Sequence, residues 1–281
     1  MTPSNHPLET WIEQADWAQP EQAVVTNPWQ DLRRYTAART ALGRSGVSLP
    51  TQALLQFGLA QAQARDAVHQ PLAVAQLATE LEQLALETAR VHSRAANREE
   101  YLRRPDLGRQ LTEASRLRLQ AAPQQGLDLA IMLADGLSST ALHHHALPFI
   151  QALLPHLRRL GITLAPIVLA EQGRVALGDE VGAALSARAV LVLVGERPGL
   201  SSPDSLGLYL TWQPRVGRLD SERNCISNVR PEGLDYTQAA HKQAWLLEQA
   251  FRRRLTGVVL KDESDATLLI TPPPPTLSSP D

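Results

Sequence analysis

An acid and a base stand side by side after a short apolar run. Residues 190–194, VLVLV, are continuous and rich in β-branched side chains, which is typical of a strand buried on both faces of a parallel sheet. Glu196 and Arg197 follow, and Pro198-Gly199 must then turn the chain. Because open α/β sheets bind ligands beyond the carboxyl ends of their strands, the pair marks a candidate site. The alternative is that both are ordinary charges at a strand end, either solvated or structurally paired.

A polar turn follows another apolar run. Residues 127–133 predict a strand, and DGLSST at 135–140 leads into a long helix. Ser139 or Thr140 can cap this helix, whose free N–H groups then form a generic cradle for an anion. Asp135 is either a candidate base at that cradle or a turn former that bonds its own backbone. Many α/β units share this pattern without holding a ligand.

The histidines and the single cysteine carry weaker signals. His143, His144 and His145 are consecutive, and consecutive helical residues point about 100° apart, so the three cannot converge on one ion. Cys225 has no histidine beside it and is interpreted as a small buried apolar residue, not as a nucleophile. The motifs GxSxG, GxxxxGK[ST], HExxH and GxGxxG are absent. We therefore assign no metal site and no catalytic residue, and favour a chain that completes the active site of another.

The first half of the chain reads as helical. Helices are expected over residues 31–42, 51–68, 72–91 and 105–121. The first of them is basic, with arginines at positions 33, 34 and 39 and a fourth at 44 just beyond. This basic face binds a partner or a phosphate, or it is a solvated surface whose arginine stems cover the core.

The second half alternates strands and helices. Strands are expected over 127–133, 162–170, 189–194, 206–212 and 225–229, with one further edge strand within 257–270. The intervening helices are expected over 140–160, 178–186 and 236–255. The predicted fold class is therefore α/β, a helical N-terminal region followed by a small, open, mostly parallel Rossmann-like sheet. The predicted divisions are an N-terminal arm (1–26), a helical region (27–124), an α/β domain (125–271) and a disordered Pro-rich tail (272–281).

Composition narrows the class of protein. The 281 residues are 43% hydrophobic and 20% charged, with a formal net charge of −2, so no overall field attracts nucleic acid. The N-terminus lacks the basic and apolar regions of a secretory signal, and no apolar run approaches the ~20 residues of a membrane span. One cysteine excludes an internal disulfide. These features predict a soluble cytoplasmic protein that binds neither nucleic acid nor a membrane.

Six segments occur in a characteristic order. They are RRYTAARTALGRSG (33–46), PTQALLQF (50–57), YLRRPDLGRQL (101–111), DGLSS (135–139), LVGERPGL (193–200) and RNCISN (223–228). In this order, and over most of the chain, they resemble the small (light) subunit of ethanolamine ammonia-lyase, an adenosylcobalamin-dependent lyase. LVGERPGL followed by CISN is the most specific part of the resemblance.

The resemblance implies a division of labour within a hetero-oligomer. In this family the large subunit is a TIM-type barrel that holds the substrate, and the small subunit covers the corrin of adenosylcobalamin from the other side. The implied reaction converts ethanolamine to acetaldehyde and ammonia by a radical mechanism, and this chain is not expected to be active alone. No histidine stands in a DxHxxG motif, so the cofactor's own dimethylbenzimidazole is expected to remain the lower ligand.

The resemblance also implies three cobalamin contacts. By position they fall on Val175 in GRVALGDE, on Glu196 and on Cys225. A corrin ring is fringed with primary amides, and a carboxylate such as Glu196 can accept their N–H groups at about 1.5–3 kcal/mol per bond. Val175 and Cys225 would act through backbone groups and shape, and none of the three is a catalytic residue.

Two other hypotheses remain open. The chain is a stand-alone α/β enzyme on a phosphorylated small molecule, with Asp135 as base, or a non-catalytic adaptor that uses its arginine-rich helices. Some members of the resembled family open with an amphipathic helix that targets a protein-shelled microcompartment. Residues 1–26 show no clear helix of that kind, so encapsulation is not expected.

Overall fold

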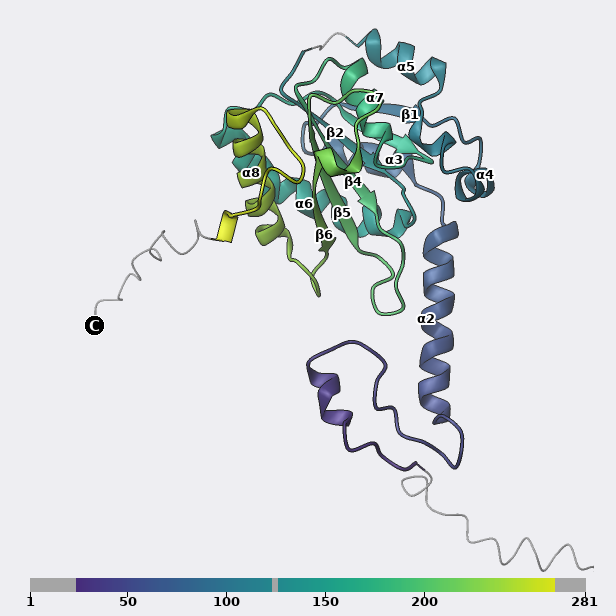
Figure 1. Ribbon diagram of the computed structural model, residues 1–281. Helices are drawn as coiled ribbons and strands as arrows, with labels where there is room; N and C mark the ends of the chain where they lie inside the picture. Colours follow the sequence, from purple (N-terminus) through teal and green to yellow (C-terminus); the bar gives the residue numbers. More distant parts are fainter. Residues whose placement is uncertain (1–23, 123–125, 266–281) are drawn as a thin grey trace, which may run out of the picture. The chain divides into compact units, whose positions relative to one another are not determined.

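A mixed, mostly parallel sheet lies in the second of two units into which the chain divides. The computed structural model describes residues 24–122 and 126–265; one unit extends to Ala62 and the other begins at Gln63. The strands lie in the order β1-β3-β2-β4-β5-β6; the first four are parallel, and β5 pairs antiparallel with both β4 and β6. Strands β4, β5 and β6 lie side by side in Figure 1. Their bounds are Thr88–His92 (β1), Leu129–Ala134 (β2), Ile167–Glu171 (β3), Ala189–Gly195 (β4), Leu206–Trp212 (β5) and Arg223–Val229 (β6). The predicted α/β class is confirmed.

Helices cover both faces of this sheet. α3, α6 and α8 share one buried apolar cluster with one face, and α5 and α7 share a second cluster with the other. The α-helices within the part of the chain that the structure describes are Thr51–His69 (α2), Val74–Glu82 (α3), Arg98–Arg103 (α4), Glu113–Gln120 (α5), Ser139–Arg159 (α6), Leu177–Ala184 (α7) and Tyr236–Arg253 (α8). Among the described residues, 3₁₀ turns span Gln30–Arg34 (η1), Leu107–Arg109 (η2) and Asp220–Glu222 (η3).

The central strands explain why the sheet forms where it does. Every residue of β2 and of β4 is buried, as their continuous apolar runs predict. Along β2, Ile131 and Leu133 enter the cluster under α6, whereas Met132 and Ala134 enter the cluster under α7. Burial of one such large apolar side chain contributes about 1.5–3 kcal/mol, so the two strands fix the core between the helix layers.

The prediction of a basic helix over residues 31–42 was wrong. Only the 3₁₀ turn η1 forms there, and residues 35–42 are irregular. The apolar side chains of this stretch have nothing to bury against in the described chain: Leu32 and Tyr35 are 47% and 77% exposed. A short helix without a packed face is marginal, because most helical stability in proteins comes from tertiary burial.

The prediction of a helix over residues 72–91 was wrong for the second half of that segment. α3 ends at Glu82, and Ala85 adopts a left-handed φ of 58°, which interrupts the helical path. The next residues are extended and form β1, which pairs in register with β3 from Thr88↔Ile167 onward. Backbone pairing with β3 at the edge of the sheet therefore makes this segment a strand.

The helix expected over residues 105–121 is also interrupted. η2 ends at Arg109, an isolated bridge joins Leu111 to Ser93, and α5 begins only after Thr112, whose hydroxyl accepts the Ser115 N–H. The sequence analysis missed α4, which Asn97 caps through a bond from the Glu100 N–H. Helices 51–68, 140–160, 178–186 and 236–255 are confirmed to within two residues of their bounds.

The remaining expectations concern ends of elements and of the chain. β3 begins at Ile167, five residues later than predicted, directly after Pro166, which has no N–H to donate to a ladder. Residues 257–265 contain no strand, and the rest of the expected 257–270 segment lies outside the described residues. The same holds for the Pro-rich tail and nearly all of the arm. Within 24–122 and 126–265, no helix is both long enough and apolar enough to cross a membrane.

Candidate functional site

Three loops meet at one edge of the sheet, because β2, β3 and β4 run parallel and end there. β2 leads to β3 on one side and β4 leads to β5 on the other, which makes the gap between β2 and β4 a topological switch point. The loops touch closely: a Cβ on Gly195 would lie 1.9 Å from the Ser138 carbonyl oxygen, and one on Gly136 would lie 2.3 Å from the Gly195 oxygen. Only glycine fits at either position without movement of backbone.

Asp135 ties the loop after β2 to the loop after β3. Its two carboxylate oxygens accept the N–H groups of Gln172 and Gly173, each at 2.9 Å, and Arg98 Nη1 lies 3.5 Å away. Burial raises the pKa of this carboxyl to about 6, although Arg98 and the backbone donors oppose the shift. Both of its oxygens are hydrogen-bonded within the chain and the residue is buried, so Asp135 is an anchor, and its arrangement gives no support to a role as base.

The helix cap is one residue earlier than predicted. Ser138, with an extended backbone at φ −150°, accepts the Ala141 N–H and caps α6. Ser139 Oγ and Thr140 Oγ1 instead bond the backbone and side chain of Gln70, at 2.6 and 2.9 Å. The expectation that Ser139 or Thr140 caps the helix was wrong, because the preceding turn extends Ser138 instead.

Glu196 lies directly after β4 and keeps part of its carboxylate open. Oε2 accepts the Ser205 hydroxyl at 2.7 Å and the Asn228 N–H at 3.3 Å. Among the described residues, Oε1 has no hydrogen-bond partner, and no ion pair joins Glu196 to the exposed Arg197. The carboxylate is thus oriented by one oxygen and offers the other as an acceptor.

The structure brings Val175, Glu196 and Cys225 together around two adjoining cavities. Val175, in the loop between β3 and α7, lines both; Glu196 lines the first, of about 380 Å³, and Cys225 lines the second, of about 290 Å³. Arg174 and Tyr209 line both as well and so stand between them. The three residues expected to contact a ligand therefore share one depressed area at the loop edge.

Cys225 was expected to be buried and is instead exposed. β6 is the last strand of the sheet, and its alternation leaves Cys225 on the open side, opposite Tyr209 of β5. Its sulfur lies 3.3 Å from Ser227 Oγ. Burial raises the pKa of the Tyr209 hydroxyl, and Cys225 and Glu196 beside it raise it further, so this hydroxyl is a neutral donor.

Sequence reasoning missed the aromatic part of the site. Tyr101 of α4 is fully buried, donates its hydroxyl to the Gly173 carbonyl at 3.2 Å, and lines the cavity of Glu196. The guanidinium carbons of Arg98 and Arg174 lie 4.8 and 4.5 Å from its ring centroid. Burial raises the pKa of Tyr101 to about 12. The only signal in the sequence was its place at the head of the segment YLRRPDLGRQL.

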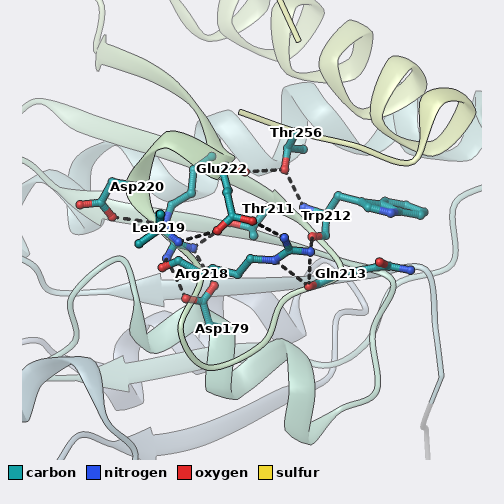
Figure 2. A network of polar contacts seen from close by, with 10 residues as sticks. Asp179, Thr211, Trp212, Gln213, Arg218, Leu219, Asp220, Glu222 and Thr256 are labelled. Atoms are coloured by element: carbon teal, nitrogen blue, oxygen red, sulfur yellow. Dashed lines mark hydrogen bonds and ion pairs between the residues drawn. The ribbon is translucent and has the colours of Figure 1, made fainter. Parts of the chain in front are cut away.

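A buried ion pair supports the second cavity from behind. Arg223 of β6 donates to both carboxylate oxygens of Asp179 on α7, at 2.6 and 2.7 Å, and to Thr211 Oγ1 at 3.0 Å. Burial raises the pKa of the Asp179 carboxyl, and the two bonds from Arg223 oppose that shift. The network continues through Arg218 and Glu222, as Figure 2 shows. It joins the helix that follows Val175 to the strand that carries Cys225.

The three histidines do not converge on one point, as expected, but two of them, His144 and His145, do meet at one carboxylate. His143 accepts the Ala73 N–H, whereas His144 Nδ1 and His145 Nε2 lie 3.2 and 3.4 Å from one Asp204 oxygen. These three ligand atoms lie within 4.8 Å of one another. Arg230 contacts the same carboxylate at 3.4 Å, so a cation already occupies its surroundings. The cluster fastens the loop that contains Asp204 to α6.

These features define a class of protein: a three-layer α/β fold with a polar site at the carboxyl ends of its parallel strands. A profile of the family described as Ethanolamine ammonia-lyase light chain (EutC) matches residues 26–261. The chain is 55% identical over 249 residues to the ethanolamine ammonia-lyase small subunit of Ralstonia nicotianae, and 56% identical over 249 residues to that of Azotobacter vinelandii. Both alignments cover 88% of this chain and 92% of the relative.

A relative from Pseudomonas fluorescens with the same name is 51% identical over 264 residues, which cover 91% of this chain and 95% of that protein. The chain belongs to the family of ethanolamine ammonia-lyase small subunits. It is a lyase subunit, and the family name implies a large-subunit partner.

Proposed function

We propose that this chain binds adenosylcobalamin at its interface with the large subunit and that the complex converts ethanolamine to acetaldehyde and ammonia. The observation that supports this most is the grouping of Val175, Glu196 and Cys225 around two adjoining cavities at the loop edge of the sheet. The expected compartment is the cytoplasm.

The residues of this edge fit the periphery of a corrin. Primary amides require both acceptors and donors. The open Oε1 of Glu196 would accept an amide N–H, and the neutral Tyr209 hydroxyl and the arginines would donate to amide oxygens. Val175, Val194 and the Tyr209 ring supply apolar contact between these polar groups. When bound, the cofactor would supply the cobalt–carbon bond whose homolysis starts radical chemistry.

The chain's own residues would hold and orient the cofactor. Glu196, fixed by Ser205 and Asn228, would anchor one amide, and Val175 and Cys225 would contribute shape and backbone contacts. The tie from Asp135 to the loop after β3 would keep Val175 at a constant distance from β4. We expect no turnover without the large chain, because these groups bind and position but do not form a proton-transfer set.

A partner is supported by the surface of the first unit. Between residues 24 and 62 the described chain exposes an unusual number of large apolar side chains, namely Val24, Val25, Trp29, Leu32, Tyr35, Val47, Leu49, Leu54, Leu55, Phe57 and Leu59. Exposed apolar surface of this extent is typical of a protein interface. Asp135, by contrast, offers no open carboxylate to a phosphorylated substrate, which leaves the stand-alone enzyme without a supporting observation.

The test is co-expression with the cognate large subunit. The purified complex should show the visible spectrum of bound cobalamin and release ammonia from ethanolamine, and each chain alone should do neither. Glu196→Gln should weaken cobalamin retention about tenfold without loss of assembly, because a charged acceptor becomes neutral. A complex that assembles but binds no corrinoid would contradict the proposal.

A further inference from the structure

The cavity beside Cys225 is more basic than a neutral corrin periphery requires. Arg109, Arg174 and Arg223 line it, against one acid, Asp220. It has a volume of about 290 Å³, and its basic side chains come from three separate elements. A cluster of guanidinium groups in a partly enclosed space is the usual means of holding an anion.

One of the three arginines is already neutralised. Arg223 is bonded to both oxygens of Asp179, and Asp220 lies 3.4 Å from its Nε. The pair is buried, with side chains only 2% and 3% exposed. Arg223 therefore shapes the wall of the cavity, and the charge that remains for a ligand comes from Arg109 and Arg174.

Arg174 is held in place before any ligand binds. Its Nη2 donates to the Tyr101 carbonyl at 3.1 Å, and its guanidinium carbon lies 4.5 Å from the Tyr101 ring centroid. Its Nε is buried and has no hydrogen-bond partner within residues 24–122 and 126–265. A buried N–H without an acceptor destabilises the folded chain, so an anionic oxygen at this place would relieve a cost that the chain otherwise carries.

Arg109 is brought beside Arg174 by a backbone contact. The Arg174 N–H donates to the Gly108 carbonyl at 2.9 Å, and a Cβ on Gly108 would lie 3.0 Å from the Tyr101 ring and 3.2 Å from Arg174 Cγ. The Leu111 N–H is fixed by Glu180 at 2.9 Å, which holds the same segment from its other end. The side chain of Arg109 is exposed, lines the cavity, and forms no hydrogen bond or ion pair with any other described residue.

We propose that Arg109 and Arg174 bind the phosphodiester of the cofactor's nucleotide loop. The inference rests on the proposed function, and it follows from the chemistry of the ligand: the corrin's amide side chains are uncharged, so the phosphodiester is the one anion on the periphery of cobalamin. Val175 lines this cavity and also the cavity of Glu196, so one ligand can reach both. The segment 101–111 thereby gains a role, to carry Arg109 and to stack Tyr101 against Arg174.

The test compares corrinoids that differ only in the phosphate. Dissociation constants of cobinamide, cobinamide phosphate and cobalamin are measured by spectral titration of the assembled complex. Wild-type complex should prefer cobinamide phosphate to cobinamide by roughly 10- to 100-fold, the range of a charge-assisted contact. Arg109→Gln and Arg174→Gln should each remove most of that preference, measured in each variant as the ratio of the dissociation constants of cobinamide and cobinamide phosphate.

Two further variants separate charge from structure. Arg174→Lys keeps the charge and should retain part of the preference, whereas Arg197→Gln, a matched exposed arginine in the cavity of Glu196, should change none of it. Equal losses for cobinamide and cobinamide phosphate, or no phosphate preference in the wild-type complex, would overturn the assignment. Failure of every corrinoid to bind the wild-type complex would overturn the proposed function itself, which is a distinguishable result.

Discussion

The loop edge of the sheet and the first 39 described residues, 24–62, are built on opposite principles. At the edge, charged groups are buried and bonded within the chain, as Asp135 and Asp179 illustrate. Between 24 and 62, only Pro50 and Ala60 are buried, and leucines such as Leu55, 68% exposed, face outward. The difference teaches that this chain fixes the geometry of its site alone but leaves large apolar side chains of its first unit exposed, and we propose that the large subunit packs there.

The largest effect is expected at the buried ion pair. Asp179→Leu should lower the free energy of unfolding of the full chain by about 3–5 kcal/mol, because Arg223 would be left buried without its carboxylate. Urea denaturation measures the change. The double variant Asp179→Leu/Arg223→Met should recover most of the loss; a small effect of the single variant would mean that the edge is less self-sufficient than its contacts indicate.

A glycine-to-alanine substitution should change the free energy of unfolding in opposite directions in the two regions. Gly195→Ala is expected to cost about 1–3 kcal/mol or more, because its Cβ would meet the Ser138 carbonyl oxygen at 1.9 Å. Gly58→Ala in α2 meets nothing within 4 Å and should stabilise the helix by up to about 1 kcal/mol. Thermal and urea unfolding of both variants compare them directly. Equal effects would remove the contrast between a packed edge and an open helix.

Asp135 makes the stability of the loop edge depend on pH. Burial raises its pKa from 3.8 to about 6, so the folded chain holds that proton more tightly than the unfolded chain. The resulting stabilisation is complete below pH 3.8 and is lost as pH rises through about 6. Asp135→Asn should abolish this slope and cost about 1–3 kcal/mol, because one amide oxygen cannot accept both the Gln172 and Gly173 N–H groups.

Asp128, at the other end of β2, is the matched control. Burial alone would raise its pKa, but hydrogen bonds from Thr163 and Arg188 outweigh burial and lower it. Its contribution is therefore present above the ordinary pKa and lost as pH falls, the reverse of Asp135. Urea unfolding of the wild-type chain, Asp128→Asn and Asp135→Asn is compared between pH 3.5 and 7, a range set by these shifts. The difference in unfolding free energy between the wild type and each variant should change with pH in opposite directions at the two positions. Differences that change in the same direction would contradict the raised pKa of Asp135.

The smallest effect on the isolated chain is expected in α2. Leu55→Ser should change its unfolding free energy by less than about 0.5 kcal/mol, since the side chain is already in water. The same variant should weaken assembly with the large chain, which co-purification and titration would measure. Arg158→Gln, an exposed residue of α6, serves as a surface control. Normal assembly of Leu55→Ser would show that this face of α2 is not the interface.

Much of the central architecture could be predicted from the sequence. Fully buried strands such as β2 and β4 can be predicted from their short apolar runs. The position of Glu196 beyond β4 follows from the glycine and proline that end the second run. The resemblance supplied Val175 and Cys225 as expected contacts, and their role toward a cofactor stays a prediction. The structure adds that both line adjoining cavities with Glu196.

The predictions that were wrong share a physical cause. β1 and the irregular stretch 35–42 were both expected to be helical, because alanine, leucine and arginine favour helices locally. Pairing with β3 overrode that preference in β1, and the lack of an apolar surface to pack on removed it in 35–42. The burial of Cys225 was misjudged for a related reason, since an edge strand has an open side that composition does not reveal.

The sequence by itself determined the class of fold, the strands of the core, the family and the residues at the ends of β3 and β4. These depend on local patterns, namely apolar runs, turn residues and motifs in a fixed order. Only the tertiary structure decided that Asp135 is an anchor, that Arg223 is neutralised by Asp179, and that Tyr101 holds Arg174 beside Arg109. Those roles depend on contacts between residues far apart in the chain, where burial and hydrogen bonding, not residue type, set the charge that a ligand meets.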